Sequence, residues 1–221
     1  MITYGENYRY QLMGYGPFDI PKKKRWIIVG SGPTSDNFDE RDVDADMGVF
    51  ALNSAFRPLK HVDISIQSHY EDCYIAYHDF HKCDLVFIAD PLHVGFRCLP
   101  VSTINLFNYD DLAYYYPYKI RWFEKELDLD KALLRTHTLF CKASIISAAI
   151  YLLARNGIEQ IEYCGIDGGY GRGSRYTNID VYRTEGRTFP NYDAAPLEMK
   201  WLADKLKIKL KPLERMSYAV A

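Results

Sequence analysis

The sequence predicts one α/β domain built on a mostly parallel sheet, and three observations support this. Short apolar runs rich in β-branched residues recur between turn-forming residues. These runs are apolar almost throughout, which is typical of parallel strands covered on both faces. Amphipathic helical patterns lie next to the later runs. With 221 residues, 48% of them hydrophobic and 25% charged, the chain fits a single core. We therefore expect one Rossmann-like, doubly wound domain over residues 1–221.

Seven segments are predicted to form the strands. They are residues 26–29, 49–52, 62–66, 85–89, 103–107 and 160–164, followed by a last strand at 208–210.

Two helices are predicted in the second half of the chain. Residues 144–155 place their apolar side chains on one face, and Asn156-Gly157 supplies a stop signal. Residues 196–206 open with Pro196, since proline is tolerated in a first helical turn. This second helix carries Leu197, Trp201, Leu202 and Lys205.

Residues 108–135 interrupt the alternation of strands and helices. They contain Tyr114-Tyr115-Tyr116-Pro117-Tyr118 and then a charged segment, a pattern that fits neither a core strand nor a clean core helix. We interpret the segment as an insertion, either a cover over an acceptor site or an aromatic cluster under a long loop.

Charge argues against a nucleic-acid partner. The formal net charge is −2, and no basic stripe runs through the chain. The basic run Lys22-Lys23-Lys24-Arg25 precedes the first strand. It is either a solvated edge or a peripheral contact for anionic lipid.

Cysteine usage and hydropathy predict a cytoplasmic location. The five cysteines are odd in number and scattered, which favours neither a disulfide framework nor a zinc site. No apolar run approaches the roughly 18–20 residues needed to span a bilayer, and the N-terminus lacks a secretory pattern. None of these features excludes a homo-oligomer.

A glycine-rich turn follows the first strand. Gly30, Ser31, Gly32 and Thr34 stand in a turn where backbone N–H groups and small hydroxyls can approach an anion. The turn is neither a dinucleotide fingerprint nor a Walker loop. The turn either binds a phosphate or a ribose, or it is a plain tight turn after the strand.

Polar residues also end two neighbouring strands. Asn53 and Gln67 follow the second and third predicted strands, and parallel strands bring such ends to one crevice. Their amides can read a base or a ribose, or can cap the loops as Asx-type turns.

The loop after residues 160–164 combines glycines with hydrogen-bond donors. Gly165 and Asp167 come first, and the loop then carries Tyr170, Tyr176 and the arginines at 172 and 175. Tyrosine hydroxyls and guanidinium groups can bind phosphate, unless the loop is a surface loop with aromatic plugs. For Asp167 we favour an orienting role over a metal-binding one.

These motifs together resemble the Campylobacter-type bacterial sialyltransferases. The resemblance rests on Val-Gly-Ser-Gly-Pro-Thr after the first strand, Ala51-Leu52-Asn53-Ser54, the helix near Ser144, and the approach to Gly165-Ile166-Asp167. Their order and spacing match from about residue 25 to 213, with low overall identity.

The resemblance implies a CMP site. In that family the glycine turn and the polar strand ends bind the nucleotide. The resemblance therefore implies that the nucleotide of this chain is surrounded by Gly30, Ser31, Gly32, Thr34, Asn53 and Gln67. The helix start is only partly matched, because the family's Thr-Ser-Gly run is replaced by Ala143-Ser144-Ile145, with Lys142 before it.

The resemblance also implies catalytic roles. Tyr170 and Tyr176 keep the spacing of two tyrosines that hold the leaving phosphate, displaced by one residue from the aspartate. The family's catalytic histidine has no counterpart in residues 188–193. Asp193 is a candidate base there, or else the cap of the helix that follows.

Three functions follow from these residues. The first is a sialyltransferase-like enzyme that moves a sugar from a CMP-activated donor to a glycan acceptor, with no metal or other cofactor. The second is a magnesium-dependent pyrophosphokinase similar to the archaeal hydroxymethylpterin enzymes, with Asp167 and one of Asp36, Asp39 or Asp90 as metal ligands. The third is a non-catalytic nucleotide or sugar binder.

Overall fold

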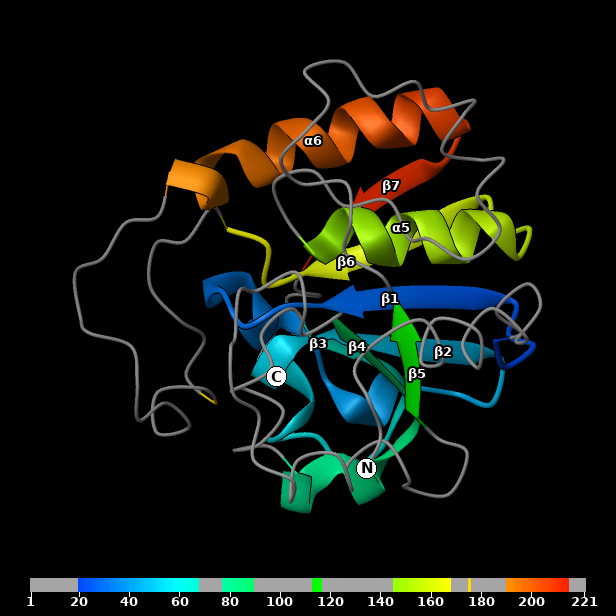
Figure 1. Cartoon of the computed structure of the whole chain (residues 1–221), viewed down its shortest axis with the longest axis vertical. Coiled ribbons are helices and arrows are strands. Elements are labelled where there is room, and N and C mark those ends of the chain that lie inside the picture. Colours follow the sequence, from blue (N-terminus) through cyan, green and yellow to red (C-terminus); the bar gives the residue numbers. More distant parts are fainter. Residues whose placement is uncertain are drawn as a thin grey trace, which may run out of the picture.

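A computed structural model describes residues 20–67, 77–89, 113–116, 145–167, 175 and 190–214. Within these ranges seven strands form one sheet in the order β5-β4-β3-β2-β1-β6-β7, and every neighbouring pair is parallel. The strands are β1 Arg25–Val29, β2 Met47–Leu52, β3 Val62–Gln67, β4 Cys83–Ala89, β5 Ala113–Tyr116, β6 Gln160–Cys164 and β7 Lys209–Pro212. The predicted α/β class is confirmed (Figure 1).

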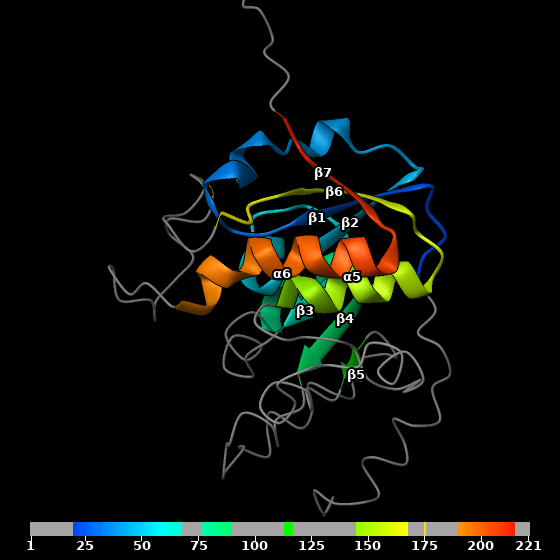
Figure 2. The ribbon, with the colours of Figure 1, turned by 90° about the horizontal axis from the view of Figure 1, so that it is seen from above.

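Two layers cover the sheet. Helices α5, Ile145–Arg155, and α6, Pro190–Leu206, pack together over one face (Figure 2). Short 3-10 helices cover the other face: η1 Pro33–Asn37, η2 Glu40–Asp42, η3 Asn53–Phe56 and η4 Tyr77–Lys82. In the described residues the double winding therefore combines α-helices on one side with 3-10 turns on the other.

Side-chain alternation explains the apolar runs. In β1, Trp26 and Ile28 belong to the core beneath α5 and α6, while Ile27 and Val29 belong to the core beneath the 3-10 helices. Successive residues of a strand point to opposite faces. Because both faces are covered, every position from 26 to 29 is buried.

Most predicted boundaries lie within a few residues of the observed ones. The observed bounds of β6 coincide with the prediction, and β1 to β4 are each lengthened by one or two residues. The last strand begins at Lys209 instead of residue 208. The predicted strand at 103–107 lies outside the described residues.

The tyrosine run contains a strand that the sequence analysis did not predict. Residues Ala113–Tyr116 form β5 at the edge of the sheet, paired with β4. Aromatic side chains favour strands, and an edge strand pairs on one side only. The remainder of the proposed insertion, 108–112 and 117–135, lies outside the described residues.

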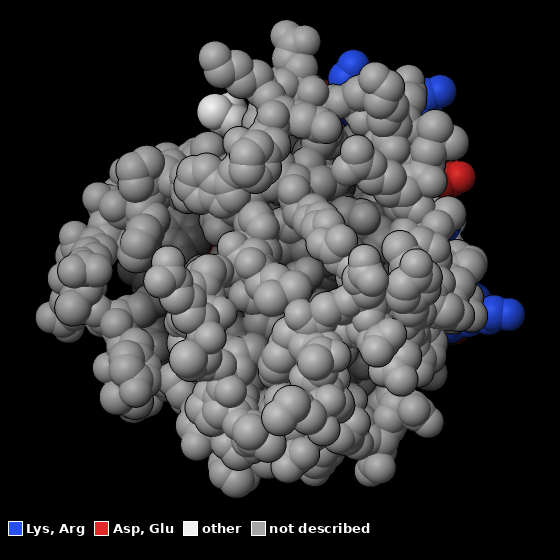
Figure 3. Space-filling model, in the orientation of Figure 1, with Lys and Arg blue, Asp and Glu red and all other residues white. Residues whose placement is uncertain are grey.

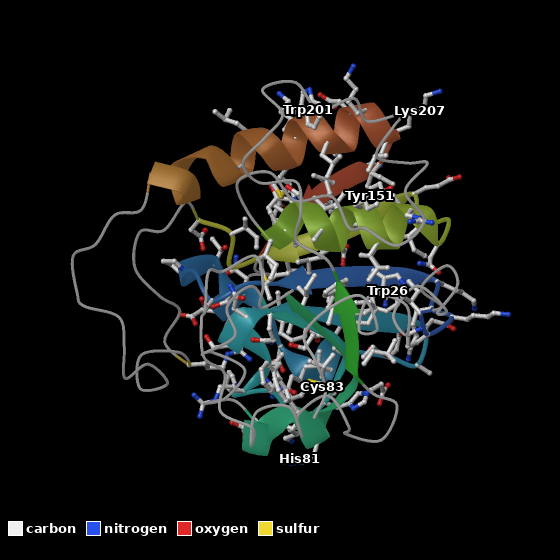
Figure 4. All side chains as sticks on the ribbon, in the orientation of Figure 1. Trp26, His81, Cys83, Tyr151, Trp201 and Lys207 are labelled. Carbon is white, nitrogen blue, oxygen red and sulfur yellow. The ribbon has the colours of Figure 1, made fainter. Side chains whose placement is uncertain are left out.

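The predicted start of the second helix was wrong. Helix α6 begins at Pro190, so Pro196 lies inside it and Asp193 is its fourth residue instead of its cap. Two prolines stand where a helix could open, and the pattern did not distinguish them. Leu197 and Trp201 remain 72% and 38% exposed, whereas Met199 and Leu202 enter the core. Figure 4 shows Trp201 on the outer side of α6.

Candidate functional site

The strand order places one reversal point in the sheet. From β1 the chain runs outward through β2, β3, β4 and β5, and it then returns to β6 on the other side of β1. In open α/β sheets, ligands bind beyond the carboxyl ends of the strands at such a point. The residues that follow β1 and β6 therefore form the candidate site.

The loops after β1 and β6 are hydrogen-bonded to each other. The Gly30 N–H donates to the Cys164 carbonyl, and the Gly32 N–H donates to the Gly165 carbonyl, both at 2.9 Å. The parallel pairing of β1 with β6 thus continues beyond the strands into the turn.

This close approach requires glycine at its centre. A Cβ on Gly165 would lie 2.3 Å from the Gly30 carbonyl oxygen, and the φ of Gly165 is +70°. A Cβ on Gly30 would lie 2.2 Å from the Gly165 carbonyl oxygen. The sequence had suggested that the glycines open the turn toward an anion. In the fold, Gly30 and Gly165 bring two loops into contact.

Thr34 and Asp167 lock the two loops together. The Thr34 N–H and hydroxyl both donate to Asp167 Oδ2 at 2.9 Å. The same hydroxyl accepts from the Gly165 N–H at 2.8 Å. Asp167 therefore has the orienting role that the sequence favoured.

These contacts decide which groups of the turn can meet a ligand. The N–H groups of Gly30, Gly32 and Thr34 already have partners inside the protein. Ser31 is partly exposed and makes no hydrogen bond within the described part of the chain. Ser31 is therefore the residue of this turn best placed to donate to a ligand.

The ends of β2 and β3 are also joined. Gln67 is fully buried, and its amide nitrogen donates to the Asn53 carbonyl at 2.9 Å and to Ser65 Oγ at 2.6 Å. Asn53 has a φ of 50°, a left-handed conformation that asparagine tolerates. The Gln67 amide donors are thus engaged in fixing the end of β2. Ser65, which accepts one of these hydrogen bonds, belongs to no recognisable motif, so the sequence did not indicate its role.

Arg175 holds part of the Gly165–Tyr176 loop against η1. Its guanidinium donates to the Ser35 carbonyl at 2.9 Å and to the Phe38 carbonyl, and it lies 5.9 Å from the centre of the Phe38 ring. The sequence had suggested that this arginine binds phosphate. Its Nη2 instead donates to these two main-chain carbonyls.

Five predicted site residues are not placed in full. Tyr170, Tyr176, Lys142 and Ser144 lie outside the described residues. Asp193 is placed only as a backbone position in the first turn of α6.

The described residues do not assemble the metal ligands of the pyrophosphokinase hypothesis. Asp167 Oδ2 is engaged by Thr34, and both oxygens of Asp39 are engaged by Arg41. Hydrogen bonds from Arg41 hold the pKa of Asp39 well below its usual range. Asp90 lies outside the described residues. The pyrophosphokinase hypothesis is therefore not supported.

A group of metal-type ligands does occur elsewhere within the described ranges. One ligand atom from each of His61, Asp63 and Asp84 lies within 4.8 Å of the other two. These residues lie at the amino ends of β3 and β4, at the opposite edge of the sheet from the candidate site. The buried Asp63 carboxylate accepts from the Val49 N–H at 2.8 Å and pairs with Lys23 at 3.3 Å. These partners give Asp63 a structural role.

The basic run before β1 is largely neutralised. Lys24 pairs with Asp46 and Arg25 with Asp44, both at 2.7 Å. The hydrogen bond to Asp46 also raises the pKa of Lys24. The blue atoms visible in Figure 3 lie at the rim of that view and do not gather into a patch. These pairs weaken the lipid-contact interpretation. No helix among the described residues has the length and hydropathy to cross a bilayer.

Comparison with solved structures confirms the predicted resemblance at the level of the fold. No known family and no curated protein matches the sequence. The α-2,3-sialyltransferase Cst-I of Campylobacter jejuni is 17% identical, with a TM-score of 0.52 over 91% of this chain and 79% of that one. The chain has the fold of the Campylobacter sialyltransferases.

A second sialyltransferase gives the same result. CstII of Campylobacter jejuni, solved with the substrate analogue CMP-3FNeuAc, is 19% identical, with a TM-score of 0.50 over 86% of this chain and 81% of that one. At these identities the likeness shows the architecture alone, because one fold can carry unrelated chemistries.

Proposed function

We propose that this chain is a sialyltransferase-like glycosyltransferase that moves a sugar from a CMP-activated donor to a glycan acceptor. The observation that carries the proposal is the locked edge at the reversal point, where Thr34 and Asp167 join the loops after β1 and β6. The shared fold with Cst-I and CstII supports it.

The chemistry of this edge favours a donor with one phosphate. A diphosphate leaving group calls for a divalent metal or a nest of unengaged N–H groups. The N–H groups of Gly30, Gly32 and Thr34 have internal partners, and Asp167 is engaged by Thr34. A monophosphate carries less charge and can be held by neutral hydroxyl donors.

In the proposed reaction, the bond between the sugar carbon and the phosphate oxygen breaks as an acceptor hydroxyl attacks from the opposite face. The transition state resembles an oxocarbenium ion, and negative charge grows on the departing CMP phosphate. Hydroxyls of Tyr170 and Tyr176 would stabilise that charge selectively. A base, for which Asp193 is our candidate, would take the acceptor proton.

The nucleoside is assigned to the ends of β2 and β3. The carboxyl ends of β3, β2, β1 and β6 lie side by side and span three inter-strand spacings, about 14 Å. We assign Asn53 to direct nucleotide contact and Gln67 to holding Asn53 in place, because Gln67 is fully buried. Ser31, Lys142 and Ser144 are proposed on the phosphate side.

A ligand panel tests the nucleotide. Thermal unfolding is measured with CMP, CDP, UDP, GDP and ATP, each with and without Mg²⁺. A ligand at a hundred times its Kd adds about 2.7 kcal/mol to the stability of the native state. We expect CMP to raise Tm without metal and the other nucleotides to do so less.

Variants make the panel specific to this site. Asp167→Asn removes the charge that orients Thr34, and Asp46→Asn removes a charge from an ion pair at the opposite edge. We expect the first variant to reduce the CMP response and the second to leave it unchanged. Stabilisation by ATP only with Mg²⁺, or by no cytidine nucleotide, would refute the donor assignment.

Turnover is tested with CMP-sialic acid and a glycan acceptor, by following CMP release. Loss of a hydrogen bond to the developing charge costs about 10²- to 10³-fold in kcat, so Tyr170→Phe and Tyr176→Phe should each lose activity on that scale. Tight CMP binding with no turnover on any acceptor would identify a nucleotide-binding protein instead.

A further inference from the structure

The protein itself uses only part of the Arg175 guanidinium. Nη2 donates to the Ser35 carbonyl at 2.9 Å and also to the Phe38 carbonyl. An arginine has five N–H donors, and Nη2 carries two of them, so three remain on Nε and Nη1. Among the described residues these three have no hydrogen-bond partner. Arg175 is thus held at one nitrogen and has donors left on the other two.

The guanidinium lies between the two loops of the candidate site. On one side it contacts Ser35, whose N–H donates to the Gly32 carbonyl at 2.9 Å. Ser35 and Gly32 are therefore one 3-10 turn apart, about 6 Å along the axis. On the other side, burial raises the pKa of Cys164 at the end of β6, and the charge of Arg175 opposes that rise. The remaining donors of Arg175 are therefore close to the ends of both β1 and β6.

Ser35 has an unsatisfied polar group of its own. Its hydroxyl is fully buried and has no hydrogen-bond partner in the described part of the chain. Buried polar groups without a partner are rare in native proteins, and those that occur often have a chemical role or meet an ion or a water. The segment that holds Arg175 thus has the character of a site that a polar ligand completes.

The charges at this edge also require a cation if an anion is to bind. Residues 30–38, 165–167 and 175 contain two carboxylates, Asp36 and Asp167, and one cation, Arg175. An anionic ligand is repelled by carboxylates at short range unless a positive charge faces it. Hydrogen bonds between a guanidinium and an oxyanion are roughly twice as strong as those between neutral groups.

We propose that Arg175 binds an oxyanion of the donor through Nε and Nη1, while Nη2 holds the guanidinium on η1. The inference rests on the proposed function, in which the donor is a CMP-activated sugar at this edge. Two groups of such a donor have the required chemistry, namely the phosphate and, in a sialic acid, the carboxylate. Because η1 already holds the guanidinium, little side-chain freedom is lost on binding.

A ratio of two affinities isolates this contact. Cytidine is the nucleoside of CMP without its phosphate, so calorimetric Kd values for the two ligands give the contribution of the phosphate within one preparation. A hydrogen bond to a charged group contributes about 10- to 100-fold in affinity. We expect Arg175→Met to reduce the preference for CMP over cytidine by that factor. The Kd of cytidine should change by less than about twofold, because the nucleoside contacts are intact.

CMP-sialic acid separates the two oxyanions. If the carboxylate is the partner of Arg175, Arg175→Met should weaken binding of CMP-sialic acid by the same factor and leave CMP unchanged. Arg175→Lys keeps the charge in a compact ammonium group, so its loss should be smaller than that of Arg175→Met. A loss as large as that of Arg175→Met would contradict the role of the charge.

Arg155→Met is the matched control for these measurements. Arg155 also lies over an aromatic ring, 5.7 Å from the centre of Tyr151, but at the carboxyl end of α5, before β6 begins. This control should keep the wild-type Kd for all three ligands. Equal losses in Arg155→Met and Arg175→Met would overturn the proposal.

Chemical modification tests the contact in the wild-type protein, where no variant has to fold. Phenylglyoxal reacts with guanidinium groups, and peptide mass analysis gives the rate at each arginine. With ligand at ten times its Kd, about one site in eleven is empty, so CMP or CMP-sialic acid should slow modification of Arg175 about tenfold. Cytidine should not slow it, and modification of Arg155 should not change.

The outcomes separate this inference from the proposed function. If the wild-type protein binds CMP, but neither the variant nor the modification distinguishes Arg175 from Arg155, the donors of Arg175 face water and only this inference is overturned. If the wild-type protein binds no cytidine compound, the donor assignment is refuted and this inference with it.

Discussion

Replacing Gly165 by alanine should destabilise the protein more than the same change at Gly157. Both glycines have a positive φ, +70° at Gly165 and +80° at Gly157. A Cβ on Gly165 would lie 2.3 Å from the Gly30 carbonyl oxygen, whereas nothing lies within 4 Å of a Cβ on Gly157. The pair therefore separates backbone strain from the close approach of the loops.

The magnitude follows from the two contributions. A left-handed backbone costs a residue with a Cβ about 1–2 kcal/mol, and both variants incur this cost. Overpacking adds about 1–3 kcal/mol at Gly165 alone, because its neighbour is backbone that cannot rotate away. The expected total is about 2–5 kcal/mol for Gly165→Ala, which at about 2–4 °C per kcal/mol lowers Tm by about 4–20 °C.

Urea denaturation measures this difference directly. Trp26 is 1% exposed in the core beneath α5, so tryptophan fluorescence reports its exposure on unfolding. If Gly165→Ala costs no more than Gly157→Ala within about 0.5 kcal/mol, the close contact between the ends of β1 and β6 is refuted. A large loss at Gly157 would show instead that strain dominates both sites.

Two further predictions concern the core. Burial raises the pKa of Cys83 and of Cys164 from an ordinary 9.0 to about 12. Because only the unfolded thiols ionise in between, the stability that these groups contribute is complete below about pH 9 and falls as pH rises toward 12. Urea midpoints should fall over that range, and less so in Cys83→Ala and Cys164→Ala; identical profiles would contradict the burial of the thiols. In α6, Leu202→Ala should cost about 2–5 kcal/mol, since Leu202 is fully buried. Leu197→Ala should stay within about 0.5 kcal/mol, since Leu197 is exposed. Similar losses in these two variants would contradict the orientation of the helix.

Sequence patterns predicted the sheet well where burial on both faces made a run apolar throughout. They did worse in the outermost described strand and in the outer helix. The tyrosines of β5 have no alternation, yet one neighbouring strand is enough to pair them. In α6, apolar side chains lie on both sides of the helix, so the pattern did not show that Leu202 faces the core and Leu197 faces solvent.

In the candidate site, too, some features could be predicted from the sequence and others could not. From the sequence alone came the edge of the sheet, the residues Gly30, Thr34, Asn53 and Asp167, and the likeness to sialyltransferases, because each is carried by a short motif at a strand end. Their partners were not predictable. Thr34 and Asp167 are 133 positions apart, and nothing in either motif specifies the other.

The sequence by itself determined the α/β class and the strands that end in polar residues, since local patterns of hydrophobicity encode both. Only the tertiary structure decided that the glycines join two loops, that Gln67 is buried behind Asn53, and that Arg175 anchors its loop to η1. The physical reason is that a side chain's role depends on which donors and acceptors it meets. Those partners are set by the pairing of distant strands, which no local pattern records.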